Sequence, residues 1–247
     1  MEKEGINVKK IMAEERWNKR NARAYERYRK LAPGDEEQFW EGALVEASMD
    51  QNAVILDLGT GTGFLARIIL KQGLNVLGLD LSRNMLAIAK KNAPDATLVR
   101  GDAERIPLKD NSVDLIVSRW VLWTLPHPGS ALEEVVRVLK PDGRVMLCDG
   151  DSKNATKHAA ATIPGGIRSC IMDIVIGWRL PRWKRVYGKL NPHLPRWGHE
   201  EISCKLRELG IEETTVVHNI NRRKSPLQRL FSHSGWEQFI VIFNNGR

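Results

Sequence analysis

A glycine-rich loop that follows a short apolar run constrains the fold of this chain more than any other feature. Residues 53–56 are apolar, Asp57 comes next, and Gly59, Gly61 and Gly63 alternate through the segment DLGTGTG. Glycine lets the backbone turn tightly and approach a ligand, and such loops lie at the carboxyl end of a parallel sheet. The segment therefore predicts a strand, a ligand-binding turn and a helix, in that order.

Short apolar segments and helix-like segments alternate through residues 53–150, which predicts a parallel sheet with helices on both faces. Ser82 is the expected N-cap of one of these helices. A terminal helix and two strands are expected to complete the sheet as an antiparallel hairpin, so the fold class is α/β. Further strands are expected at 75–79, 97–100, 113–118, 144–148, 214–219 and 238–243, and helices at 64–70, 85–91, 131–139 (stopped by the turn at 140–143) and 200–209.

Two aspartates and a phenylalanine narrow the choice of ligand. The dinucleotide fingerprint requires glycine where Phe64 stands, and Asp57 would repel a pyrophosphate but suits a cationic amino group. Asp80 ends the next strand, where a carboxylate can accept both hydroxyls of a ribose. The expected ligand therefore has a ribose and a positive, phosphate-free tail, which describes S-adenosylmethionine.

The chain resembles the class I S-adenosylmethionine-dependent methyltransferases, and within them the ubiquinone/menaquinone-biosynthesis-like small-molecule group. Four segments carry the resemblance in order: VILDLGTGTGFLA, VLGLDLSRNML, VRGDAERIPLKDNSVDLIVSRWVLWTLPHP and VLKPDGRVMLCDG. It is strong over residues 54–150 and weaker at the N-terminus. It implies a Rossmann-like, mostly parallel seven-stranded sheet, a methyltransferase activity, S-adenosyl-L-methionine as cofactor and S-adenosyl-L-homocysteine as product.

The resemblance also implies roles for single residues. Asp57 and the three loop glycines would lie beneath the methionine moiety, and Thr60 is either a ligand contact or a simple turn residue. Asp80 would bind the ribose. The remaining expected cofactor contacts are Leu81 beside the adenine, Asp102 at the adenine amino group, Ala103 through its backbone and Arg119 at the methionine end.

Composition divides the chain into four parts. Residues 1–50 are expected to form helices that cover the cofactor and acceptor site, and residues 51–150 the cofactor-binding core. Residues 151–200 contain several Trp, Arg and Pro residues and lack the alternation of strand-like and helix-like segments seen before them. They are expected to cap the acceptor pocket. Residues 201–247 would supply the last helix and strands.

Methyl transfer from a sulfonium mainly requires alignment and exclusion of water, and a base only where the acceptor must lose a proton. Each candidate for these roles has a structural alternative as a loop acid, a surface histidine or a packed aromatic residue. Residues 11–30 favour a helix with Trp17, Tyr25 and Tyr28 near one side. The candidate catalytic residues are Asp149, His158 and Tyr25, and the candidate acceptor-binding residues are Trp17, Tyr28, Trp120, Trp123, Arg168, Trp178 and Arg179.

Several function classes are disfavoured by what the sequence lacks. No His, Asp and Glu cluster has the spacing of a zinc site, so metal-independent transfer is expected. Methyltransferases that act on the amino groups of adenine or glutamine carry an Asn/Asp-Pro-Pro motif after the fourth strand. This chain has Ser118-Arg119-Trp120 at that position, which disfavours both acceptors. No apolar run approaches the roughly 20 residues of a membrane span, and no secretory signal or CxxC pair is present. We expect a cytoplasmic monomer or homodimer.

Charge leaves two alternatives open. The chain carries a net charge of +8, and residues 1–150 are neutral, so the excess lies in residues 151–247. Its basic run at 179–189 is either a solvated face or a contact for an anionic partner.

The main prediction is transfer of a methyl group to an O, N or S atom of a small, anionic or aromatic acceptor. The alternatives are an RNA methyltransferase and a non-catalytic S-adenosylmethionine-binding regulatory protein.

Overall fold

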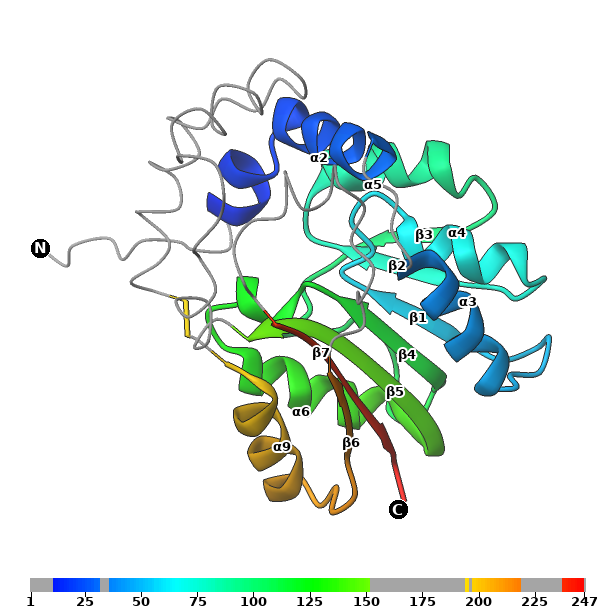
Figure 1. Ribbon diagram of the computed structural model, residues 1–247, viewed down its shortest axis with the longest axis vertical. Helices are drawn as coiled ribbons and strands as arrows, with labels where there is room; N and C mark the ends of the chain where they lie inside the picture. Colours follow the sequence, from blue (N-terminus) through cyan, green and yellow to red (C-terminus); the bar gives the residue numbers. More distant parts are fainter. Residues whose placement is uncertain (1–10, 32–35, 152–193, 196, 219–236, 247) are drawn as a thin grey trace, which may run out of the picture.

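The computed structural model describes residues 11–31, 36–151, 194–195, 197–218 and 237–246 of the 247-residue chain. These residues form a seven-stranded sheet in the order β3-β2-β1-β4-β5-β7-β6 (Figure 1). Strands β1 to β5 are parallel, whereas β7 pairs antiparallel with both β5 and β6. The predicted α/β fold with its C-terminal antiparallel hairpin is confirmed.

Most strands and helices lie within one to three residues of their predicted bounds. The strands are β1 (Ile55–Leu58), β2 (Leu77–Asp80), β3 (Thr97–Arg100), β4 (Val113–Arg119), β5 (Leu139–Asp151), β6 (Thr215–His218) and β7 (Glu237–Asn244). The helices are η1 (Ile11–Arg16, a π-helix), α2 (Lys19–Leu31), α3 (Glu36–Glu46), α4 (Phe64–Lys71), α5 (Arg83–Asn92), η2 (Leu122–Thr124, a 3-10 helix), α6 (Pro128–Val138) and α9 (His199–Glu208). Ser82 caps α5 as predicted, because its Oγ accepts a hydrogen bond from the Met85 N–H.

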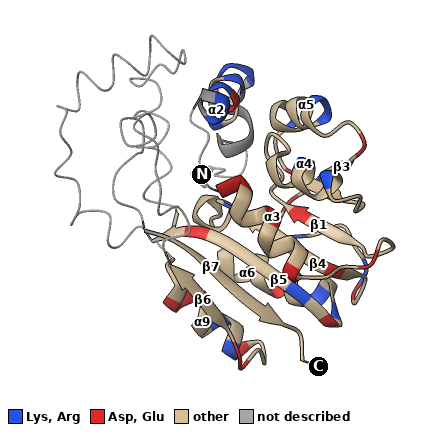
Figure 2. Cartoon of the chain, turned by 45° about the vertical axis from the view of Figure 1, so that its right-hand side comes forward, with Lys and Arg blue, Asp and Glu red and all other residues tan. Residues whose placement is uncertain are grey.

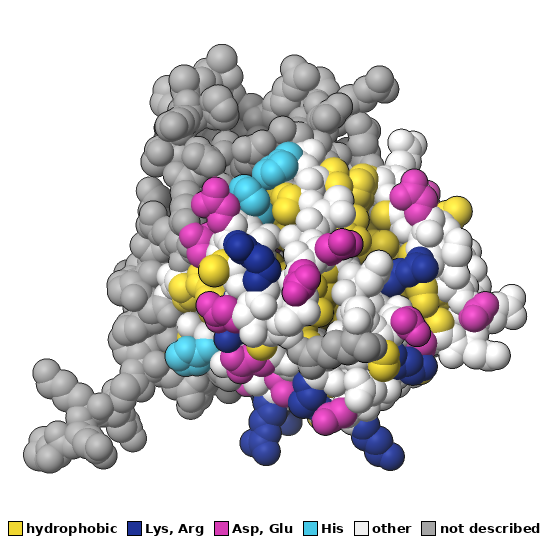
Figure 3. Space-filling view, turned by 90° about the horizontal axis from the view of Figure 1, so that it is seen from below, with side chains coloured by type: hydrophobic (Ala, Val, Ile, Leu, Met, Phe, Trp, Pro, Cys, Tyr) yellow, Lys and Arg dark blue, Asp and Glu magenta, His cyan; other side chains and the backbone are white. Residues whose placement is uncertain are grey.

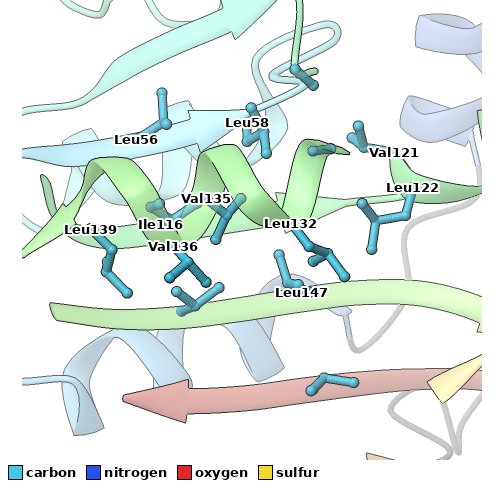
Figure 4. Close-up of a cluster of buried hydrophobic side chains, with 14 of the residues drawn as sticks. Leu56, Leu58, Ile116, Val121, Leu122, Leu132, Val135, Val136, Leu139 and Leu147 are labelled. Carbon is cyan, nitrogen blue, oxygen red and sulfur yellow. The ribbon is translucent and has the colours of Figure 1, made fainter. Parts of the chain in front are cut away.

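Two hydrophobic layers cover the two faces of the sheet, because successive side chains of a strand point to opposite faces. Leu56 and Leu58 of β1 pack in the layer formed with α6 and α9, where Leu132 and Val135 of α6 are fully buried (Figure 4). Ile55, one residue away, packs in the opposite layer with α3 and α4. This double burial explains why the strands read as continuous apolar runs.

The N-terminal segment departs from the single helix predicted for residues 11–30. Helix α2 starts anew because the Asn18 Oδ1 accepts hydrogen bonds from the backbone N–H groups of Arg20 and Asn21, both at 3.0 Å. Trp17 therefore lies in the connection before α2, and the prediction that it shares a helix with Tyr25 is wrong. The two rings nevertheless meet edge to face, with centroids 5.4 Å apart.

Strand β5 also differs from its prediction. The turn at 140–143 was expected to separate a helix from a strand, but Leu139 already pairs with Val113 of β4. The register then shifts, so that Arg144 pairs with Leu115, and residues 140–143 form an irregularity inside the strand. The strand continues to Asp151, past the predicted end at Cys148, because β7 pairs with it along residues 144–151.

Among the described residues, no helix is long and apolar enough to cross a bilayer. Within the same residues, no group of three His, Cys, Asp or Glu side chains is arranged to hold a metal ion.

The glycine loop between β1 and α4 is held close to the neighbouring strands. The N–H groups of Gly59 and Thr60 donate to the Leu79 carbonyl oxygen of β2 at 2.7 and 2.9 Å. Gly59 has a φ of 70°, and a β-carbon there would lie 2.2 Å from Cγ2 of Val121. Both the backbone angle and the contact with Val121 therefore require glycine at this position.

Replacing Gly59 with Ala should lower the free energy of unfolding by about 2–4 kcal/mol, since the left-handed conformation and the overpacking both cost free energy. The matched control is Gly42→Ala in α3, where a β-carbon meets no atom of the described part of the chain within 4 Å. That control should raise stability by about 0.5–1 kcal/mol, because alanine favours a helix over glycine. Urea unfolding of both variants measures the difference, and equal effects would contradict the role given to the Val121 contact.

Candidate active site

Asp57 is buried and directed back into the glycine loop. Its Oδ2 accepts a hydrogen bond from the Thr60 hydroxyl at 2.6 Å and from the Ala66 N–H at 3.1 Å. Burial raises the pKa of Asp57 to about 7, against the effect of these two hydrogen bonds. Asp57 and Thr60 thus join the end of β1 to the start of α4 and fix the shape of the loop.

Asp80 lies at the end of β2 and bonds to two different loops. Its Oδ2 accepts from the Gly61 N–H at 2.9 Å, and its Oδ1 accepts from the Ser82 N–H at 2.8 Å. Burial raises the pKa of Asp80 to about 6, although both hydrogen bonds favour the carboxylate. Each oxygen of an ionised carboxylate can accept about two hydrogen bonds, so this side chain retains capacity for a ligand.

The predicted adenine-side residues lie on the loop after β3. The Asp102 Oδ1 accepts a hydrogen bond from the Glu104 N–H at 3.0 Å, and Ala103 is buried. Helix α6 holds this loop: Glu134 accepts from the Ile106 N–H at 2.7 Å, while Arg137 donates to the carbonyl oxygen of Ile106 at 2.9 Å. Leu81, on the neighbouring loop, is half-buried, and its carbonyl oxygen accepts from Arg100.

Arg119, at the end of β4, forms a largely buried ion pair with Glu36 of α3. Its Nε and Nη2 donate to the two carboxylate oxygens of Glu36, Nη2 at 2.7 Å. The side chains of Arg119 and Glu36 are only 13% and 12% exposed. Arg119 also donates from Nη1 to the Tyr25 hydroxyl at 3.0 Å, so residues from α2, α3 and β4 meet at this point.

This cluster contains a second guanidinium group. Arg29 of α2 lies over the Phe64 ring, with its central carbon 3.5 Å from the ring centroid, and Arg119 lies 5.1 Å from the same centroid. Burial and the charge of Arg119 lower the pKa of Arg29. Glu36 and Glu26 also interact electrostatically with Arg29, but among the described residues no carboxylate lies within ion-pair distance of it.

The Tyr25 hydroxyl has an unusual environment. Burial alone raises the pKa of Tyr25, but the charges of Arg119 and Arg29 and the hydrogen bond from Arg119 outweigh it, so the pKa is lowered. A phenol that accepts a hydrogen bond from a guanidinium can still donate its own proton. Tyr25 therefore fits a role in proton transfer at this edge of the sheet.

Several of the predicted acceptor residues are brought together. The guanidinium carbon of Arg16 lies 4.3 Å from the centroid of Trp17 and 5.8 Å from that of Trp123. The Trp17 carbonyl oxygen accepts hydrogen bonds from Ser82 and Asn84 at the start of α5, at 3.2 and 3.0 Å. The N-terminal segment is thereby fixed next to the loop that carries Asp80.

Asp149 lies at the end of β5 and is buried. Its Oδ2 accepts from the Trp123 N–H at 3.1 Å and its Oδ1 from the Gly150 N–H at 2.8 Å. Trp120, in the same turn as Trp123, is half-buried. His158, Arg168, Trp178, Arg179 and the side chain of Tyr28 lie outside the described residues, as does most of the predicted cap at 151–200.

Sequence reasoning missed three side chains that shape the site: Glu36, Arg29 and Arg137. Glu36 pairs with a residue 83 positions away, and no pattern in the sequence indicates such a contact. Arg29 is one of several basic residues in α2, and nothing in the sequence distinguishes it from the others. Glu134 and Arg137, three residues apart on one helix, form an ion pair that their spacing could have indicated.

Replacing Glu36 with Ala should lower the free energy of unfolding by about 3–5 kcal/mol, because it leaves a buried arginine without its partner. The matched control is the adjacent Glu37→Ala, which removes a more exposed pair with Arg67 and Lys71. The control should cost about 0.5–1 kcal/mol. Similar losses of the free energy of unfolding for both variants would show that the buried Glu36–Arg119 pair contributes no more to stability than the more exposed pair.

Comparison with known sequences identifies the central segment. Residues 56–147 match a family model described as a methyltransferase domain. The chain is 34% identical over 111 residues to a demethylmenaquinone methyltransferase of Paenarthrobacter aurescens, a match that covers 44% of each protein. The chain thus spans less than half the length of this curated relative.

Solved structures share the fold at low sequence identity. A phosphoethanolamine N-methyltransferase of Haemonchus contortus, in complex with phosphomonomethylethanolamine and S-adenosylhomocysteine, matches with a TM-score of 0.66 and 18% identity over 98% of this chain and 61% of its own. The 4+2 cyclase SpnF matches with a TM-score of 0.57 and 18% identity, over 84% of this chain and 80% of its own. Likenesses at this level of identity establish the fold alone.

The fold, the glycine loop with its two aspartates and the matched family model agree with one another. Residues 56–147 thus match a methyltransferase domain, as the sequence motifs predict, and this segment is similar to demethylmenaquinone methyltransferases.

Proposed function

We propose that this protein transfers the methyl group of S-adenosylmethionine to a small-molecule acceptor. The observation that carries the proposal is Asp80, a carboxylate that ends β2 beside the glycine loop. Each of its oxygens accepts a backbone N–H from a different loop. A carboxylate at this position suits the two hydroxyls of a ribose, because each oxygen can accept a further hydrogen bond.

The residues around the loop fit the rest of the cofactor. Gly59 and Gly61 have positive φ angles, and among the described residues a β-carbon on Gly61 would meet only the Gly59 carbonyl oxygen within 4 Å. The backbone therefore permits close approach of a ligand. The guanidinium groups of Arg29 and Arg119 beside Phe64 suit the carboxylate of the methionine moiety.

The bound cofactor would supply an activated methyl group, so the tasks of the protein are to orient the acceptor and to exclude water. The rings of Trp17 and Trp123, with Arg16 between them, border the side of the site where an acceptor would approach. Tyr25 is the candidate for removing a proton from the acceptor, since Arg119 stabilises its phenolate form. His158 remains a candidate base from the sequence.

The acceptor class is proposed from the side chains and from the relatives. Aromatic rings and guanidinium groups favour a flat or anionic acceptor. A demethylated quinone and a phosphorylated amine, which the names of two relatives mention, are the first compounds to test. The predicted acceptor atom is O, N or S. A quinone would have to be in its reduced hydroquinone form to act as the nucleophile, through an oxygen or a ring carbon that loses its proton.

An RNA acceptor is the second candidate, because helix α2 is rich in Lys and Arg residues (Figure 2). The exposed Lys and Arg side chains of α2 are spaced so that they lie on one side of the helix, within about 100° of its circumference. Elsewhere, on the face seen from below, acidic and basic side chains are interspersed (Figure 3). RNA binding that weakens steeply with salt would favour this candidate. The exposed cations of α2 are Lys19, Arg20, Arg23, Arg27 and Lys30.

Affinity for S-adenosylhomocysteine should rise with pH through the pKa of Asp80, which is about 6. The ionised carboxylate accepts both ribose hydroxyls, whereas the protonated form has lost one acceptor oxygen. Binding should therefore be about tenfold weaker at pH 5 than at pH 7. Asp80→Asn should remove this pH dependence, and Asp80→Ala should weaken binding by about 1.5–3 kcal/mol. Calorimetric affinities that are unchanged in folded Asp80→Ala protein would reject the assignment.

Replacing Tyr25 with Phe should lower kcat by about a hundredfold or more if the phenol removes a proton from the acceptor. The phenyl ring keeps the packing against Trp17, so affinity for S-adenosylhomocysteine should change less than twofold. Release of S-adenosylhomocysteine from the methyl donor, with the acceptors named above, measures kcat. An unchanged kcat would show that Tyr25 does not remove a proton from the acceptor.

A further inference from the structure

The turn at residues 120–125 lacks an acceptor of its own for its first N–H groups. Helix η2 has only three residues, and its capping residue Val121 makes no side-chain hydrogen bond to it. The first N–H groups of a helix need acceptors from outside the helix. The neighbouring strand supplies them: Asp149 accepts from the N–H groups of Trp123, at 3.1 Å, and of Leu122.

The same turn contains a strained residue. Trp120 has a φ of 59°, in the left-handed region that bulky side chains avoid. Two hydrogen bonds hold it there: its N–H donates to the Cys148 carbonyl oxygen at 2.8 Å, and its own carbonyl oxygen accepts from Nε1 of Trp123 at 3.1 Å. Such strain persists only where surrounding contacts fix the conformation, and it is concentrated at functional sites.

The turn also connects the two halves of the site. On one side Val121 packs so closely on Gly59 that a β-carbon there would lie 2.2 Å from its Cγ2. On the other side the Trp123 ring lies near Arg16, which also covers Trp17. A displacement of the turn would therefore move both the cofactor loop and the acceptor side.

We propose that Asp149 is a positioning residue: its carboxylate holds the turn at 120–125 against the glycine loop and so keeps the acceptor side aligned with the cofactor. The two halves of the site are those of the proposed function, on which this inference rests. Both oxygens of Asp149 accept backbone N–H groups, which suits this role better than that of a general base.

The position of the turn should depend on pH. Burial raises the pKa of Asp149 to about 7, against its three backbone hydrogen bonds and the charge of Arg119. Among the described residues, Cys148 also interacts with Asp149, and the pKa values of Cys148 and Arg119 both lie well above their ordinary ranges. Neither therefore titrates near neutral pH. A protonated Asp149 has one acceptor oxygen fewer, so the turn should loosen as the pH falls below about 7.

Amide hydrogen exchange at Leu122 and Trp123, corrected for intrinsic rates, tests this inference without an acceptor. Asp149→Asn mimics the protonated acid and should speed exchange at both amides at least tenfold at pH 8. In the unaltered protein the same amides should exchange faster at pH 5.5 than at pH 8, and the variant should lack this pH dependence. The matched control is Asp114→Asn, whose carboxylate accepts from the Val54 N–H at the opposite edge of the sheet.

The outcomes separate this inference from the proposed function. Faster exchange in Asp149→Asn but not in Asp114→Asn, with a fivefold or greater loss of S-adenosylhomocysteine affinity, supports the positioning role. Exchange that is unchanged by Asp149→Asn and by pH overturns it, even where the protein binds S-adenosylhomocysteine. If Asp149→Asn does not fold, the pH dependence of amide exchange at Leu122 and Trp123 in the unaltered protein tests the inference by itself. Failure of the unaltered protein to bind S-adenosylhomocysteine would reject the proposed function instead.

Discussion

Buried carboxylates that accept backbone N–H groups hold the loops at the carboxyl edge of the sheet. Asp57 bonds to the start of α4, Asp80 to the glycine loop and the start of α5, and Asp149 to the turn after β4. Each lies at or near the end of a parallel strand, where the chain leaves the sheet. The loops that form the site therefore have defined positions before any ligand binds, which lowers the cost of ordering them on binding.

This arrangement has a thermodynamic cost that depends on pH. Burial raises the pKa values of Asp57 and Asp149 to about 7, whereas an aspartate in an unfolded chain titrates near 3.9. These two groups therefore bind more protons in the folded protein than in the unfolded chain between about pH 4 and pH 7. Their contribution to the free energy of unfolding should fall as the pH rises through that interval, because burial disfavours their charged forms in the folded state. Such a cost is typical of polar groups retained at functional sites.

The N-terminal helices join the site through a different kind of contact. The Arg119–Glu36 pair links the end of β4 to α3, and the Tyr25 hydroxyl bonds to the same arginine from α2. Removing one partner of a buried pair leaves a charge without compensation, so the helices and the strand end are fixed together. With Arg29 nearby, the cluster places two guanidinium groups against the Phe64 ring.

Features that depend on local sequence could be predicted, and those that depend on distant contacts could not. The glycine loop, the cap of α5 by Ser82 and the strand bounds follow from turn chemistry and apolar runs, which extend over a few residues. The break before α2 depends on Asn18, a capping signal that competes with a helix-favouring composition. The extension of β5 past Cys148 and the Glu36 pair arise from β7 and from α3, far away in the chain, so no local pattern contains them.

Titration of the three aspartate carboxyl groups by carbon-13 NMR, with and without S-adenosylhomocysteine, tests the central claim most directly. That claim is that Asp80 faces the cofactor while Asp57 and Asp149 hold the loops. Single Asp→Asn variants assign the signals. Bound S-adenosylhomocysteine should lower the pKa of Asp80 from about 6 and leave those of Asp57 and Asp149 near 7. A ligand that shifts Asp57 or Asp149 more than Asp80, or that shifts none of the three, would contradict it.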